Sequence, residues 1–98
     1  MKKLSSIESE VVNILSEECA EVIQIISKIQ RFGLDSCHPN EPNVTNLDNL
    51  HSELGDLLAM AGICINIKLI EEEKLALAVD RKVEKLKKWS TIFKDEEA

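Results

Sequence analysis

Helix-breaking residues are concentrated in one stretch of this chain, and that concentration restricts the fold more than any other feature. Both prolines and the first of three glycines lie in GLDSCHPNEPN, residues 33–43, which predicts a loop. The residues on either side have helical periodicity, and no segment alternates between apolar and polar residues as a half-buried strand does. The sequence therefore predicts an all-α fold, an antiparallel helical bundle.

Three helices are expected. The first should span about residues 6–32, with Gly33 suited to end it. A cap at Thr45 or the next residue begins the second helix, which continues to a break placed within residues 66–70. No glycine or proline marks that break. The third helix should cover about residues 72–89.

Length and composition limit the class of protein. Ninety-eight residues predict one domain, with residues 90–98 as a frayed tail. The net charge of −6 argues against binding to nucleic acid, which needs a basic patch. No apolar run reaches the length of a membrane span. With no visible signal peptide and an odd number of cysteines, a cytoplasmic location is expected. Because a chain this short can bury only part of its aliphatic surface, a homo-oligomer is also expected.

Two pairs of acidic residues occupy the apolar faces of the first two expected helices. Helix residues advance by about 100° each. The apolar residues around Glu18 therefore fall within about 60° of it, and Glu21 lies about 60° to one side. Glu53 and Asp56 repeat this spacing on the second helix, with Asn49 extending the polar strip. An ionised carboxylate in an apolar setting is costly unless it is paired or bound to a metal.

A divalent cation would resolve this cost, and all-oxygen ligation favours Mg²⁺ or Mn²⁺. A single pair of acids three residues apart usually marks a solvent-exposed helix face. Two such pairs, on the apolar faces of consecutive helices, favour a metal site. A zinc site at Cys37 and His38 is not supported, because no second Cys or His pair stands at ligand spacing.

The acidic motifs resemble the signature of the MazG-like all-α nucleoside triphosphate pyrophosphohydrolases, in their compact single-domain form. EECAE, residues 17–21, matches EExxE, and ELGD, residues 53–56, matches ExxD. The similarity extends through QIISKIQRFG and ELGDLLAMAG to AVDRKVEKLKKW, and so covers about residues 16–89. The 31 residues between the two motifs are slightly more than the family usually has. The excess falls in the loop, where it can shape the base pocket.

The resemblance implies Mg²⁺-dependent hydrolysis of a nucleoside triphosphate, expected to be a dNTP, to the monophosphate and pyrophosphate. The water attacks the α-phosphorus, and the role is nucleotide-pool control or house-cleaning. By position, the metal ligands are Glu18, Glu21, Glu53 and Asp56. Glu17, about 100° from Glu18, is better placed in an outer shell or as a base that holds water. The expected substrate contacts are Gln24, Lys28, Arg31, Asn46, Asp80, Lys82 and Lys85. For these contacts the alternative is a solvated helix surface.

The family also suggests a dimer or a dimer of dimers, with the active site near a subunit interface. Two other functions stay open. One is the related phosphoribosyl-ATP pyrophosphohydrolase, which shares the fold and the acidic motifs. The other is a helical interaction module, not an enzyme, whose acids form salt bridges with a partner.

Overall fold

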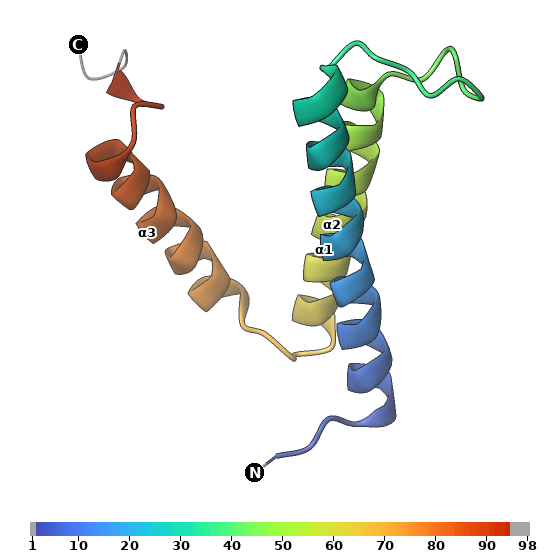
Figure 1. Ribbon diagram of the computed structural model, residues 1–98. Helices are drawn as coiled ribbons and strands as arrows, with labels where there is room; N and C mark the ends of the chain where they lie inside the picture. The colour runs from blue at the N-terminus through green and yellow to red at the C-terminus, as the bar shows by residue number, and fades with distance from the viewer. Residues whose placement is uncertain (1, 95–98) are drawn as a thin grey trace.

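Three α-helices, and no strand, make up the part of the chain that the structure describes, residues 2–94 of a computed structural model. Helix α1 spans Ser6–Phe32, α2 spans Asn46–Asn66 and α3 spans Glu72–Trp89 (Figure 1). These bounds confirm the all-α prediction and the position of the break between the second and third helices. Residues 95–98 of the expected tail lie outside the described part.

Side-chain caps fix the beginnings of α1 and α2. The hydroxyl of Thr45 accepts a hydrogen bond from the backbone N–H of Asp48 at 3.0 Å, and the Asp48 carboxylate accepts one from the Thr45 N–H at 3.0 Å. Ser5 and Glu8 form the same reciprocal box before α1. At the other end of α1, Gly33 has a φ of 91°, which glycine adopts without the steric cost of a Cβ.

Helix α2 ends in a Schellman motif that has a lysine where glycine is usual. The N–H of Leu69 donates to the carbonyl of Cys64 at 2.9 Å, and the N–H of Lys68 donates to that of Ile65 at 2.9 Å. Lys68 has a φ of 63°, in the left-handed region. Leu69 and Ile70 pack against the hydrophobic core and so hold this turn in place. Because a lysine, and not a glycine, occupies this left-handed position, no local sequence pattern indicates where α2 ends.

Helices α1 and α2 pack against one another as an antiparallel hairpin (Figure 1). Their facing sides bury a small aliphatic set: Val11, Val22, Ile25, Met60 and Cys64. Burial of a large apolar side chain contributes about 1.5–3 kcal/mol. The hairpin therefore has a core of its own, although a small one.

The loop between α1 and α2 is fastened to the start of α2. The backbone N–H of Asn46 donates to the carbonyl of Ser36 at 2.8 Å, and the N–H of Leu47 donates to that of Leu34 at 3.0 Å. The side-chain Nδ2 of Asn46 donates to the carbonyl of Gly33 at 2.9 Å. These three bonds close the base of the loop, and Asn46 is buried there.

Helix α3 stands away from the hairpin, and Figure 1 shows it diverging after the link at residues 67–71. Leu75 and Val79, which are four residues apart and so lie on the same side of α3, are 37% and 55% exposed. Within one chain, therefore, only α1 and α2 form the expected antiparallel bundle. In residues 2–94 no helix is both long enough and apolar enough to cross a membrane.

Candidate metal and substrate site

Three carboxylates converge between α1 and α2. One oxygen from each of Glu18, Glu53 and Asp56 lies within 4.8 Å of the other two. Glu18 and Glu53 are half-buried, and Asp56 is exposed. The helical spacing predicts that these residues point inward. Because α1 and α2 pack face to face, acids from both helices therefore meet at one point.

The cluster is electrostatically unfavourable as it stands. Partial burial raises the pKa of Glu18, and the negative charges of Asp56 and Glu53 raise it further. Glu21 and Glu17 add to this repulsion at a smaller level. Each cause acts against the ionised form of the Glu18 carboxylate.

Basic side chains do not neutralise the cluster. Among residues 2–94, the ion pairs join Lys74 to Glu71 and Lys87 to Glu84, all at or on α3. A hard divalent cation would supply the missing positive charge, and three carboxylate oxygens at this separation are the donor set that such a cation prefers. The residues present therefore fit a divalent metal ion.

A hollow of about 140 Å³ adjoins the carboxylate cluster. It is lined by Glu21, Gln24, Ile25, Lys28, Glu41, Asn49 and Glu53. Three of the predicted site residues, Glu21, Gln24 and Lys28, therefore share one wall, formed by successive turns of α1. Glu41 was not expected here. It comes from the loop between the helices, where no periodic pattern indicates the direction of a side chain.

A second, larger hollow of about 370 Å³ lies at the loop end of the hairpin, and we call it the loop pocket. It is lined by Lys28, Phe32, Asn46 and Asn49 together with loop residues 36–39. Lys28 and Asn49 line both hollows. The two spaces are therefore neighbours, with the carboxylates at one end and the loop at the other.

The remaining predicted residues lie farther from the carboxylates. The guanidinium of Arg31 lies over the ring of Phe32, with Cζ 5.2 Å from the ring centroid. Asp80, Lys82 and Lys85 are exposed on α3. This helix stands apart from the hairpin (Figure 1). A single chain thus does not bring the α3 residues to the carboxylates.

The fold and the site together define an all-α protein with a candidate carboxylate metal centre between antiparallel helices. The family model of the MazG nucleotide pyrophosphohydrolase domain matches residues 7–90. The chain therefore belongs to this family, as its acidic motifs predict, and it is a nucleotide pyrophosphohydrolase domain. Comparisons with curated proteins and with solved structures gave no match.

Proposed function

We propose that this chain hydrolyses a deoxynucleoside triphosphate to the monophosphate and pyrophosphate, with Mg²⁺ as its cofactor and Mn²⁺ as a possible substitute. Its role would be control or cleaning of the nucleotide pool. The observation that carries the proposal is the convergence of Glu18, Glu53 and Asp56 in a chain of this family. The raised pKa of Glu18 supports it, because the cluster has more negative charge than its surroundings balance.

The carboxylates Glu18, Glu53 and Asp56 would hold the cation, with Glu21 on the adjoining wall as a further ligand. When bound, a divalent cation neutralises triphosphate charge and lowers the pKa of a water molecule. Glu17 is exposed beside this group and is suited to hold a water by accepting a hydrogen bond from it.

Lys28 and Gln24 would orient the triphosphate. Both line the hollow beside the cluster. The Lys28 ammonium can attract phosphate oxygens, and the Gln24 amide can donate a hydrogen bond to them. Lys28 is the basic residue among those that line this hollow, and Gln24 lies one turn before it on α1, so these two are the first candidates for direct contact with the substrate.

We also propose a homodimer, because one side of the hairpin is apolar. Val12, Ile23 and Ile26 on α1, and Leu54 and Leu58 on α2, are all exposed. Each lies about 80–140° around its helix from the inward carboxylate, in the same rotational sense. Since the helices are antiparallel, equal rotations place both stripes on the same side of the hairpin. We call this side the apolar face.

A second copy of the chain would cover the apolar face, while the polar side that carries Glu21 and Lys28 stays open to substrate. The exposed stripe of α3, including Leu75 and Val79, needs cover as well. In such an assembly, the basic residues Lys82 and Lys85 of one subunit can approach the triphosphate held by another, together with Asp80. A dimer of dimers extends the same arrangement.

The function is tested by incubating the protein with Mg²⁺ and a panel of NTPs, dNTPs and phosphoribosyl-ATP, followed by a pyrophosphate assay. We expect release from a dNTP that stops with EDTA. It should fall by at least about 100-fold in Glu53→Gln, since the loss of even an outer-shell partner of a metal site costs roughly 10–100-fold. Glu10→Gln, an exposed acid elsewhere on α1, should leave the rate unchanged.

Two results would overturn the proposal. Activity confined to phosphoribosyl-ATP would make the chain a phosphoribosyl-ATP pyrophosphohydrolase, the alternative that the acidic motifs leave open. If no substrate in the panel is hydrolysed and Mg²⁺ does not raise the melting temperature, the remaining function is that of an interaction module whose acids bind a partner.

A further inference from the structure

The loop pocket is a separate space from the carboxylate site, and neither the acidic motifs nor the metal chemistry explains it. Its volume of about 370 Å³ lies near the lower end of the range of roughly 300–1,000 Å³ typical of small-molecule sites. It shares Lys28 and Asn49 with the hollow beside the carboxylates. A ligand could therefore place an anionic end near the cation and its other end against the loop.

We propose that the loop pocket binds the nucleoside end of the substrate, with the base stacked on Phe32 and with residues 36–39 of the loop setting the base preference. This inference rests on the proposed function, because the triphosphate must lie at the carboxylates for its base to reach the loop. It assigns base recognition to a segment that lies between the two acidic motifs and belongs to neither.

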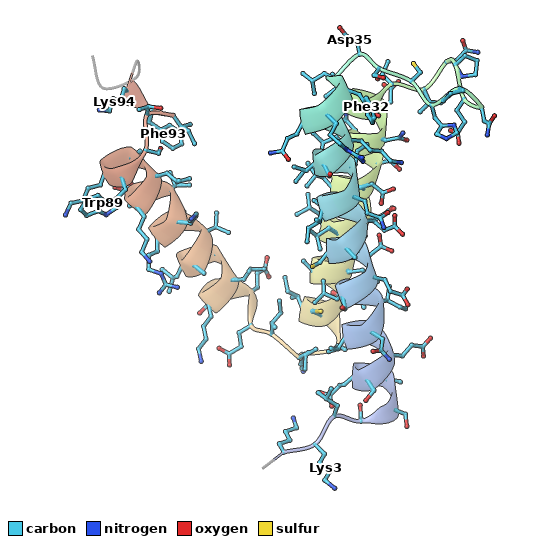
Figure 2. All side chains as sticks on the ribbon, in the orientation of Figure 1. Lys3, Phe32, Asp35, Trp89, Phe93 and Lys94 are labelled. Carbon is cyan, nitrogen blue, oxygen red and sulfur yellow. The ribbon has the colours of Figure 1, made fainter. Side chains whose placement is uncertain are left out.

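An aromatic ring lies at the pocket without being part of the core. Phe32, the last residue of α1, is 63% exposed yet lines the pocket. Figure 2 shows it at the loop end of the hairpin, close to Asp35. A phenyl ring exposed beside a hollow offers a flat apolar surface, and bases of every kind stack on such surfaces. Pro39 adds a second apolar wall to the pocket.

The polar groups of the pocket complement the edge of a base. His38 Nδ1 accepts a hydrogen bond from the backbone N–H of Asn40 at 3.1 Å. The proton of the neutral imidazole is then on Nε2, which becomes a donor for a base carbonyl. The Nδ2 of Asn46 donates a hydrogen bond to the carbonyl of Gly33. The amide oxygen of Asn46 is then left as an acceptor for an amino or imino group of a base. Donor and acceptor thus come from two residues that line the same pocket.

The loop walls are held in position by the fold. The three hydrogen bonds that Asn46 and Leu47 make to residues 33–36 close the base of the loop. An isolated antiparallel bridge joins Cys37 to Thr45. Within the loop, the N–H of Glu41 donates to the carbonyl of His38 at 2.9 Å. A fixed wall can select one base shape over another, which a mobile segment does less well.

The first test measures nucleoside binding without metal or hydrolysis. Cys37 lines the pocket and is half-buried, Cys19 is exposed elsewhere on α1, and Cys64 is buried in the core. In EDTA, the protein is alkylated with N-ethylmaleimide in the presence of saturating thymidine, deoxycytidine, deoxyadenosine or deoxyguanosine. We expect at least one nucleoside to slow alkylation of Cys37 several-fold and to leave that of Cys19 unchanged, as followed by peptide mass spectrometry.

Failure of this test is distinct from failure of the proposed function, because it requires neither the cation nor turnover. If none of the four nucleosides slows alkylation of Cys37, or if deoxyribose alone slows it equally, the pocket does not bind a base and the inference is wrong. If a nucleoside protects Cys37 but the protein releases no pyrophosphate, the pocket binds a nucleoside and the proposed reaction is wrong.

The second test uses kinetics. Phe32→Ala should raise KM for the preferred dNTP by about tenfold, since a stacking surface is lost. It should leave KM for inorganic tripolyphosphate, which has no base, unchanged. Leu34→Ala removes another exposed apolar side chain close by that does not line the pocket, and should change neither value. Equal changes for both substrates in Phe32→Ala would refute a role in base binding.

Discussion

Asn46 connects the fold of the hairpin to the shape of its pocket, so its replacement by alanine is an informative perturbation. The residue is only 6% exposed, although its side chain is polar. Its Nδ2 donates to the carbonyl of Gly33 at 2.9 Å, across the base of the loop. Asn46→Ala should therefore loosen the loop and destabilise the protein, while leaving the carboxylate cluster in place.

The size of the effect follows from four contributions. Loss of the hydrogen bond costs about 0.5–1.5 kcal/mol. Gly33 is itself exposed, so water can hydrogen-bond its carbonyl in the variant and the added penalty is small. The space left by the amide costs about 1 kcal/mol, and the better helix propensity of alanine returns up to about 0.7 kcal/mol. The net expectation is a loss of about 1–2 kcal/mol, which corresponds to a decrease of roughly 4–16 °C in Tm for a chain of this length.

Urea unfolding followed by circular dichroism measures this difference. Wild type and variant must be compared at one protein concentration, because association would make apparent stability depend on it. Asn43→Ala, at an exposed loop position, is the matched control and should change the free energy of unfolding by less than about 0.5 kcal/mol. If Asn46→Ala unfolds at the same urea concentration as this control, the Asn46–Gly33 bond does not anchor the loop.

Two further predictions concern the carboxylates and the assembly. A glutamate whose pKa is raised by folding stabilises the folded state below its ordinary pKa and loses that contribution as the pH rises through the raised pKa. In EDTA, Glu18→Gln should therefore have a higher Tm than wild type at neutral pH, with a difference that shrinks on acidification. Leu58→Glu puts a charge on the apolar face, and light scattering should show a dimer in wild type and a monomer in this variant.

Both predictions have clear contrary results. A lower Tm for metal-free Glu18→Gln at neutral pH would mean that the carboxylate stabilises the fold through a partner, which contradicts a site built for a cation. Asn13→Glu, exposed on α1 away from the apolar face, is the control for Leu58→Glu. A monomeric wild type, or equal loss of association in both variants, would refute the dimer at this face.

The local features of the fold were predictable because their causes are local. The start of α2 follows from the Thr45–Asp48 box, and the end of α1 follows from Gly33 at positive φ. The convergence of Glu18 with Glu53 and Asp56 follows from regular helical geometry, since 100° per residue predicts direction well over a few turns. The direction of a side chain on a regular helix can be predicted from residue spacing once the side that faces the other helix is known.

Other features depend on the irregular backbone or on contacts distant in sequence. Glu41 reaches the hollow because hydrogen bonds close the loop in one conformation, and no pattern in the loop sequence indicates it. The place of α3 was not predictable either. Its apolar stripe shows that it must pack against something, but periodicity cannot say against which helix or against which subunit. Lys82 and Lys85 therefore remain predictions until the assembly is determined.

The end of α2 also determines how α3 leaves the hairpin. Of the five residues between the helices, the backbone N–H groups of 67–70 all donate to carbonyls of the last turns of α2. Only Glu71 is free of these bonds. The directions open to α3 are thus restricted by its own chain, before any partner arrives. A second subunit would then bind a helix α3 whose orientation relative to the hairpin is already restricted. Association would therefore cost less conformational entropy than the docking of a helix joined by a fully flexible link.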